Sequence, residues 1–298
     1  MSAGLPGRMV ELIKRDVKIF FLHRKHRFHI ALGTSFSIGH LSLLGRTQSY
    51  FFSTNDDAAT TLNRYLSYPF VTKIIQPDCI RPDQWRTKRI FHRSYHPLAY
   101  LHPNHFQPDV NILKKYNIQK KEYVIIRSNI HRAHHDSRFD GIPEAVLSDV
   151  HSALRDYQII SSRENDRTPQ IDPWDMHHVM AFAKMVIADS STMVAEAAVL
   201  GVPALCYHPC VGYLGYLKEL EHKFGLVFGF GPGQEEALLM KIKDLLAQPG
   251  LSDEWQLRRG KMLSQKEDLT QWLIDWFEKL AAEHEIRNGD LAGHVPGF

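Results

Sequence analysis

The chain has 298 residues, a hydrophobic fraction of 44 %, a charged fraction of 23 % and a formal net charge of +3. These values are typical of a globular protein of one or two domains, and the small net charge excludes a broadly basic nucleic-acid-binding surface. No apolar run approaches the roughly 20 residues that a membrane-spanning helix needs. The cysteines Cys79, Cys206 and Cys210 are too few for a disulfide framework and lack zinc-ligand spacing. We therefore expect a cytoplasmic protein without a metal site.

The first predicted element is a helix over residues 9–27 that is both basic and amphipathic. Residues 8–27 hold seven Lys and Arg against two acidic residues. Apolar side chains recur at helical spacing at Met9, Leu12, Ile13, Val17, Phe20 and Phe21. Two interpretations remain open. The helix can cover a face of a sheet with its basic side in water, or it can make a peripheral contact with an anionic membrane surface.

Short apolar segments alternate with helices through the first third of the chain. Strands are predicted at 29–33, 50–53, 71–76 and 89–92, and helices at 38–44 and 56–65. This alternation predicts a parallel sheet with helices on both faces and crevices at the carboxyl ends of the strands. The stretch 93–118, rich in Pro, His and Asn, is expected to connect this sheet to a second domain.

The same alternation continues in the second part of the chain. Strands are predicted at 123–127, 158–161, 185–188 and 204–207, and helices at 112–116, 144–155, 174–182, 191–200, 235–247 and 269–282. The glycine-rich stretch 229–233 resembles a phosphate loop, but its proline favours a helix entry. We expect an N-terminal domain over 1–110, a second domain over 111–262, a helix over 263–284, and a flexible tail over 285–298.

The densest candidate site lies in the strand–turn–helix segment from Lys184 to His208. A buried apolar strand is followed by Asp189-Ser190-Ser191-Thr192, a cluster of helix N-cap residues. The free amides and the dipole of a helix N-terminus bind anions, and the three hydroxyl groups add donors. Glu196 lies one turn further along the same helix face, where its carboxylate would reach a ribose if a diphosphate occupied the turn. The alternative is an ordinary N-cap followed by a solvated glutamate.

A second candidate group follows the strand at 123–127. It lies at the carboxyl end of that strand, which is expected to adjoin the Ser190 turn, and contains Arg127, Arg132, His134, His135 and Asp136. Either arginine can bind a diphosphate through two parallel hydrogen bonds. Either histidine, or the aspartate, can act as a general acid or base. The alternative is a solvated polar loop without a role in chemistry.

The segment from Asp189 to Pro203 resembles the nucleotide-sugar motif of GT-B glycosyltransferases and UDP-N-acetylglucosamine 2-epimerases. In those families a D-S-G-G or H-G-G turn holds the diphosphate, a glutamate on the following helix holds the ribose, and a G-x-P closes the helix. The spacing here matches without a gap, although Ser191-Thr192 replaces Gly-Gly and allows a less close backbone approach to phosphate. The resemblance also implies that Trp174 and Met176 flank the base.

A larger part of the chain is similar to the GT-B-like domain-of-unknown-function family 354. The similarity covers most of residues 9–245 and includes the stretches RDVKIFF, ALGTSFSIGHLSLLG, DDAATTLNRYLSYPF, SYHPLAYLHPNHFQPD and DPWDMHHVMAFAKMVIADSSTM. It implies an α/β fold of the GT-B type, with two Rossmann-like parallel-sheet domains facing a cleft. The domain over 111–262 would bind the nucleotide-sugar, and the helix over 263–284 would cross back to the first domain. The matched segment begins at about the third helix of such a fold. We therefore expect a truncated or reduced first domain without its opening βαβ unit.

The function that this resemblance implies is glycosyl transfer from a nucleotide-sugar, UDP-linked, in cell-surface glycan or polysaccharide biosynthesis. The donor is a substrate, no further cofactor is expected, and the acceptor is a glycan or a lipid-linked molecule. One alternative is a UDP-sugar 2-epimerase or hydrolase, which needs paired acid/base carboxylates that the sequence does not place. Another is a non-catalytic nucleotide-sugar-binding or scaffold protein.

Overall fold

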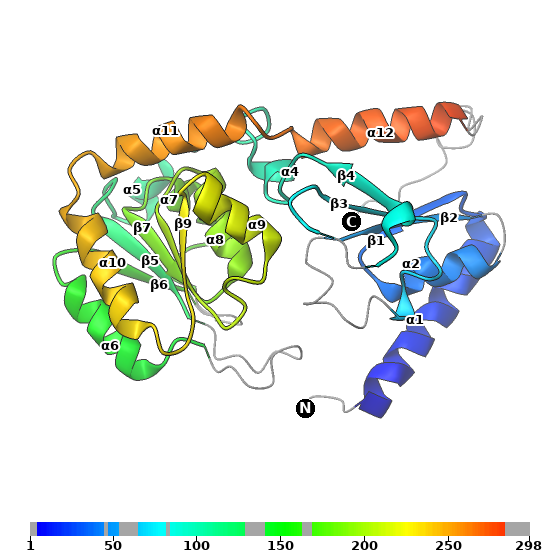
Figure 1. The fold of residues 1–298 in the computed structure, drawn as a ribbon, viewed down its shortest axis with the longest axis horizontal. Coiled ribbons are helices and arrows are strands. Elements are labelled where there is room, and N and C mark those ends of the chain that lie inside the picture. The colour runs from blue at the N-terminus through cyan, green and yellow to red at the C-terminus, as the bar shows by residue number, and fades with distance from the viewer. Residues whose placement is uncertain are drawn as a thin grey trace.

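The computed structural model describes residues 5–44, 47–53, 65–81, 84–128, 141–162 and 169–283. Its strands form two parallel sheets that lie beside each other (Figure 1). Two C-terminal helices, α11 (Leu251–Leu263) and α12 (Leu269–Glu283), run one after the other across both sheets. The expected α/β class with two Rossmann-like parallel sheets is confirmed.

The N-terminal sheet has four parallel strands in the order β1-β2-β3-β4. All four lie within two residues of the predicted strands, because each is a short apolar run bounded by turn residues. Alternate residues face opposite sides of the sheet. Tyr50 and Ile75 pack against Leu280 of α12, whereas Phe51 and Ile74 pack on the other face. The elements are α1 (Leu5–His26), β1 (Ile30–Gly33), α2 (Phe36–Leu41), η1 (Ser42–Leu44), β2 (Gln48–Phe52), β3 (Lys73–Pro77), η2 (Arg86–Lys88) and β4 (Arg89–His92).

The second sheet has five parallel strands in the order β6-β5-β7-β8-β9. Its helices α6 and α10 contact each other, as do α7 and α8, in keeping with right-handed crossovers that place them on opposite faces. The central strand β7 is buried throughout, as expected for a parallel strand covered on both sides. The elements are α4 (Leu98–Leu101), α5 (Ile112–Lys115), β5 (Tyr123–Arg127), α6 (Glu144–Ala153), β6 (Gln158–Ser162), α7 (Met176–Ala181), β7 (Met185–Ala188), α8 (Ser191–Val199), β8 (Ala204–Tyr207), α9 (Gly215–Lys218), η3 (Glu219–Lys223), β9 (Val227–Phe230) and α10 (Glu235–Ala247).

The sequence pattern does not predict every element of the second domain, and β9 and α11 are among those it misses. The interpretation of 229–233 as a helix entry is wrong for its first two residues, which end β9. Gly229 weakens the strand signal, but a Cβ there would lie 2.5 Å from Val211 Cγ1, so packing requires glycine. The buried apolar side chains of α11, Leu251, Trp255 and Met262, share one face of the helix, but Arg258 interrupts the apolar pattern between the last two. Most of the predicted helix 56–65 and the tail 285–298 lie outside the described residues.

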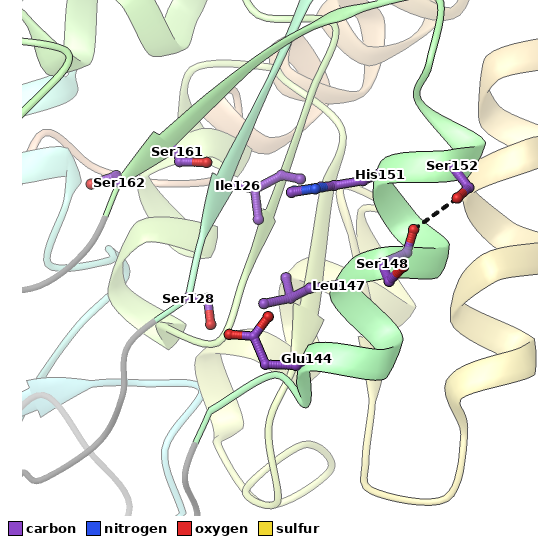
Figure 2. A pocket seen from close by; sticks show the side chains of 9 residues that line it. All are labelled: Ile126, Ser128, Glu144, Leu147, Ser148, His151, Ser152, Ser161 and Ser162. Atoms are coloured by element: carbon purple, nitrogen blue, oxygen red, sulfur yellow. Dashed lines mark hydrogen bonds between the residues drawn. The ribbon is translucent and has the colours of Figure 1, made fainter.

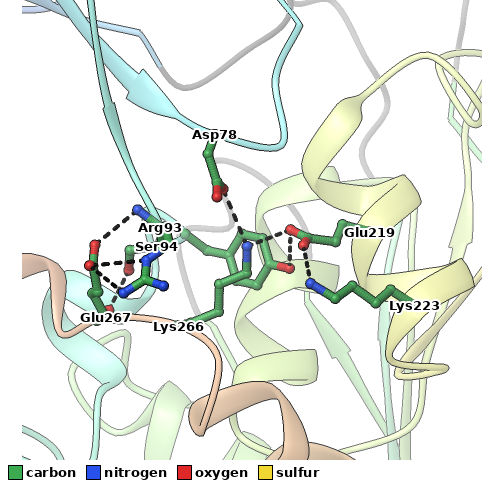
Figure 3. Close-up of polar contacts among 8 residues, drawn as sticks. Asp78, Arg93, Ser94, Glu219, Lys223, Lys266 and Glu267 are labelled. Atoms are coloured by element: carbon green, nitrogen blue, oxygen red, sulfur yellow. Dashed lines mark hydrogen bonds and ion pairs between the residues drawn. The ribbon is translucent and has the colours of Figure 1, made fainter.

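A buried lysine between α11 and α12 joins the two sheets. The side chain of Lys266 is 2 % exposed, and its Nζ lies 2.6 Å from Glu219 Oε2 and 3.5 Å from Asp78 Oδ1 (Figure 3). Asp78 follows β3 of the first sheet, whereas Glu219 begins the π-helical turn η3 of the second domain. Tyr95 donates to the same Glu219 oxygen at 2.7 Å. Burial alone would raise the pKa of Glu219, but hydrogen bonds from Lys266, Tyr95 and Lys223 outweigh it and lower that pKa.

The residue after this lysine is tied to the chain that leaves β4. The backbone N–H of Glu267 donates to the carbonyl of Arg93 at 2.8 Å, and Ser94 Oγ donates to the carbonyl of Glu267 at 2.6 Å. The guanidinium of Arg93 also contacts the carboxylate of Glu267 at 3.2 Å (Figure 3). The connection between α11 and α12 is therefore fixed to the first sheet by backbone and side-chain bonds.

We expect Lys266→Met to lower the free energy of unfolding by about 3 kcal/mol, because it leaves the partly buried Glu219 without its closest cation. Urea denaturation measures the change. Lys261→Met, at an exposed position of α11, is the matched control and should change the same free energy by less than about 0.5 kcal/mol. Adding Glu219→Gln to Lys266→Met should restore part of the loss. If Lys266→Met is as harmless as the control, the ion pair does not hold the sheets together.

Candidate functional site

The strand order of the second sheet creates a switch point between β5 and β7. The chain passes from β5 to β6 on one side and later continues from β7 to β8 and β9 on the other. Ligands of doubly wound sheets bind at such a point, outside the carboxyl ends of the strands. Arg127 pairs with Ala188 in the register, and the backbone N–H of Asp189 donates to the carbonyl of Arg127 at 3.2 Å. The two predicted site segments therefore begin side by side.

The helix α8 begins at this edge and is capped by Ser190. This residue has an extended backbone (φ −102°, ψ 113°), and its Oγ accepts a hydrogen bond of 3.5 Å from the N–H of Met193. Ser191 and Thr192 form the first turn, and Thr192 is exposed. The predicted N-cap is thus present. The first turn of such a helix presents its remaining amides and the positive end of its dipole to the crevice.

The other end of α8 is capped by side chains of α11. Gly201 has a φ of +74°, the left-handed conformation that ends many helices. Gln256 Nε2 donates to the carbonyls of Leu200 and Gly201 at 3.2 and 3.0 Å, and Arg259 Nε donates to the carbonyl of Val199 at 2.7 Å. The carbonyls that a helix leaves unpaired at its C-terminus are therefore satisfied, and α8 is held from behind by α11.

Glu196 lies in the middle of α8 and is not the solvated side chain that the simpler interpretation expects. Its side chain is 15 % exposed. The hydroxyl of Tyr100, on α4, donates to Oε1 at 2.8 Å, and His177 Nε2, on α7, lies 3.4 Å from the same oxygen. Among the described residues, no hydrogen bond reaches the second carboxylate oxygen, Oε2. Glu196 is thus oriented by two neighbours while one of its oxygens stays available.

Two aromatic groups beside Glu196 have shifted pKa values. Burial, followed by the negative charge of Glu196, raises the pKa of Tyr100, so the phenol stays protonated and can only donate to the carboxylate. Burial lowers the pKa of His96, and the nearby Glu196 opposes this effect only in part. The ring of His96 lies 6.0 Å from the ring of Tyr100 and 6.0 Å from that of Phe52, at the carboxyl end of β2. His96 therefore stands between the first sheet and α8, neutral at neutral pH.

The other predicted site residues are placed less directly. Arg127 ends β5, but its Nη1 donates to Ser162 Oγ at 3.1 Å, towards β6 and away from β7. Trp174 is 90 % exposed in the turn before α7, and Met176 is partly buried against the hydrophobic core of the second sheet. Arg132 and the acid/base candidates His134, His135 and Asp136 lie outside the described residues.

A cavity of about 480 Å³ lies on the β6 side of the switch point. It opens between α6 and the carboxyl halves of β5 and β6, and Figure 2 shows hydroxyl groups and one imidazole around it. Its polar lining includes Ser128, Glu144, His151, Ser161 and Ser162. None of its lining residues comes from β7 or α8, so this cavity is separate from the Ser190 turn.

Three groups suited to metal binding come together within the described part of the chain, although the sequence predicts no metal site. Ligand atoms of Asp78, Cys79 and Glu219 lie within 4.8 Å of one another. The ammonium group of Lys266 contacts both carboxylates of this cluster. A positive charge is therefore already present where a cation would bind, and the arrangement favours an ion pair over a metal centre.

Sequence patterns do not predict the contacts of Tyr100, His96 and His177 with the region of Glu196. Tyr100 is 96 positions away from Glu196 in the chain. The histidines and prolines around it indicate a connection between domains rather than a site. The one usable signal is that polar and aromatic side chains are dense in a segment expected to bridge two sheets, where ligand sites occur often.

Solved structures share this fold at low sequence identity. The chain is similar to UDP-GlcNAc 2-epimerase from Methanocaldococcus jannaschii in complex with UDP-GlcNAc and UDP, with a TM-score of 0.57 and 13 % identity over 86 % of this chain and 82 % of that chain. The match to sucrose-phosphate synthase from Thermosynechococcus elongatus has a TM-score of 0.60 and 12 % identity over 95 % and 81 %. The match to spinosyn forosaminyltransferase SpnP has a TM-score of 0.55 and 13 % identity over 90 % of this chain and 79 % of that chain.

These comparisons concern the fold alone, because all three identities are low. They confirm the predicted GT-B-like class of two parallel α/β sheets. No family model matches the sequence, and the search of curated proteins gave no match. The similarity to family 354 therefore stays a prediction.

We expect Gly201→Ala to destabilise the protein by about 2 kcal/mol more than Gly212→Ala, as measured by urea denaturation. Both glycines have a positive φ, so both substitutions strain the backbone. A Cβ at Gly201 would lie 2.5 Å from Gln256 Nε2 and 2.7 Å from Arg259 Cδ, whereas nothing lies within 4 Å of one at Gly212. The difference between the two losses of unfolding free energy therefore measures the contact between α8 and α11. Equal losses in the two variants would show that this contact contributes no stability.

Proposed function

We propose that the protein binds a UDP-linked sugar at the switch point of its second sheet and transfers the glycosyl group to an acceptor. The observation that carries this proposal is the pairing of an open helix N-terminus with an oriented carboxylate. The Ser190 turn begins α8 beside the end of β5, and Glu196 follows about 6 Å beyond Thr192 along the helix axis. This separation suits a diphosphate on the turn and a ribose on the glutamate.

The chemical task of the turn is to stabilise the leaving diphosphate. Charge grows on the departing oxygen as the glycosyl bond breaks, and fixed donors aimed at that charge supply the main catalytic effect of such a site. The free amides of the first turn, the hydroxyls of Ser191 and Thr192, and the helix dipole can play this part. Arg127 would assist if its guanidinium turned from Ser162 towards the diphosphate.

The task of Glu196 is to hold the ribose. Its Oε2, which no described residue binds, would accept from the sugar hydroxyls. Tyr100 and His177 fix the carboxylate through Oε1. Two solved structures with this fold, those of the Staphylococcus aureus protein MnaA and of the M. jannaschii epimerase, contain UDP. They support a nucleotide-sugar as the class of ligand.

Two groups are candidates for moving the acceptor proton. His134, His135 and Asp136 remain the acid/base candidates predicted from the sequence. His96 is a further one, because its lowered pKa keeps it neutral and it faces α8 from the side of the first sheet.

Incubation with a UDP-sugar, first alone and then with glycan or lipid-linked acceptors, separates transfer from the alternatives. Release of an epimer or of free sugar without an acceptor would identify an epimerase or hydrolase. Binding without turnover both in the absence and in the presence of acceptors would identify a scaffold.

We expect UDP to bind the wild-type protein with measurable heat in a calorimetric titration, and Glu196→Ala to weaken binding by about 10- to 100-fold because charge-assisted hydrogen bonds to the ribose are lost. The wild type should bind 2′-deoxy-UDP about tenfold more weakly than UDP, and Glu196→Ala should bind both equally. Glu278→Gln, at an exposed position of α12, is the charge-matched control and should behave as wild type. Undiminished discrimination in Glu196→Ala would exclude Glu196 as the ribose ligand.

We expect Tyr100→Phe to weaken UDP binding by about 3- to 10-fold, because the variant keeps the ring but loses the bond that orients Glu196. The same titration should show that Tyr100→Phe weakens the binding of 2′-deoxy-UDP less, because that ligand makes fewer hydrogen bonds to the Glu196 carboxylate. Tyr213→Phe removes a hydroxyl from a ring that is 70 % exposed and serves as the control. Tighter binding of UDP to Tyr100→Phe would instead mean that the tyrosine competes with the ribose.

A further inference from the structure

The helix α1 packs on the molecule through one narrow side only. It contacts α2, where Leu12 is buried and the carboxylate of Asp16 lies 2.8 Å from His40 Nδ1. Arg15 reaches Ser35 Oγ at 3.0 Å from the same side. The N-terminal half of α1 extends away from both sheets (Figure 1). Most of the circumference of this helix therefore faces solvent.

A broad part of that exposed circumference is apolar. At 100° per residue, six apolar side chains fall within a sector of about 120° that does not include the packed side. They are between 36 % and 63 % exposed and comprise Met9, Val10, Ile13, Val17, Phe20 and Phe21. The rings of Phe20 and Phe21 contact each other edge to face at 5.7 Å. An exposed apolar surface of this extent on a globular protein marks a binding surface.

Basic side chains border this apolar sector. Lys14, Lys18 and Lys25 follow one edge of it on the helical wheel, and Arg24 lies at its C-terminal end. Residues 8–27 carry a formal charge of +5 against +3 for the whole chain, so all other residues together carry −2. Of the two acidic residues in α1, Asp16 is turned towards His40, and Glu11 pairs with Lys14 at 3.2 Å. The positive charge of the protein is thus concentrated around one apolar surface.

We propose that this surface docks on an anionic lipid membrane, with the apolar sector at the boundary between headgroups and acyl chains and the lysines on lipid phosphates. Apolar side chains next to a row of cations are the combination that binds a helix in the plane of a charged bilayer. A second copy of the chain is disfavoured as the occupant, because two helices of charge +5 would repel each other. No helix in the described ranges is long and apolar enough to span the bilayer, so α1 lies along the surface.

Co-sedimentation of the full chain with vesicles tests this proposal. Binding is expected to vesicles of equal parts phosphatidylcholine and phosphatidylglycerol, to fall with added salt, and to be at least about tenfold weaker on pure phosphatidylcholine. Phe20→Ser with Phe21→Ser should lower the partition coefficient on the anionic vesicles by about tenfold or more. Lys18→Glu with Lys25→Glu should also lower this partition coefficient by about tenfold or more.

Matched variants place the same changes elsewhere on the surface. Met240→Ser with Leu257→Ser alters two exposed apolar side chains, and Lys243→Glu with Lys279→Glu makes the same change of net charge. Both pairs should bind the vesicles as the wild type does, and circular dichroism should show unchanged helix content in all four variants. Loss of binding in the control pairs, or equal binding to both kinds of vesicle, would overturn the proposal. So would a dimer, seen by light scattering, that only the Phe20 and Phe21 variant abolishes.

Discussion

The ammonium group of Lys266 is the contact on which the arrangement of the two sheets depends. It is almost fully buried and lies between a carboxylate of the second domain and one that follows β3 of the first. A charge at such a place cannot be left unpaired without a large loss of free energy, so the relative position of Asp78 and Glu219 is specified by the ion pair. The backbone bond between Glu267 and Arg93 repeats that constraint one residue further on.

This constraint matters for the candidate site because the site draws on both sides of the molecule. Glu196 belongs to α8 of the second domain, but the hydroxyl that orients it comes from α4, in the segment that follows β4. Tyr95, three residues before α4, donates to the carboxylate that Lys266 neutralises. The ion pair and the ribose-binding group that we propose are therefore linked through one short stretch of chain.

The fold could be predicted from the sequence wherever local pattern decides structure. β7 and α8 follow from an apolar run, a cluster of N-cap residues and a Gly-x-Pro stop, and the structure has all three. The sequence pattern misses β9 because Gly229 lowers the strand propensity of this segment. The glycine is needed there because a Cβ would clash with Val211. The sequence misses α11 for a different reason: only three apolar side chains mark its buried face, and the polar residues between them include Gln256 and Arg259, which donate hydrogen bonds to α8.

The same distinction holds within the candidate site. The spacing of Ser190 and Glu196 is a property of one helix, so the sequence predicts it. The contacts of Glu196 with Tyr100 and His177 depend on how three helices from distant parts of the chain pack, and no local pattern records that packing. For the same reason Arg127, placed correctly at the end of β5, has a side-chain direction that only the neighbouring strand determines.

The capping of α8 by Gln256 and Arg259 has a mechanical consequence. It joins α8 and α11 into one stiff unit, since neither helix can shift without breaking hydrogen bonds to buried carbonyls. A rotation of the first sheet relative to the second would leave this unit intact and would have to be absorbed in the segment that follows β4 and in the five residues between α11 and α12. Lys266 lies within those five residues, so the ion pair that fixes the sheets also restrains one of the two connections through which they could move.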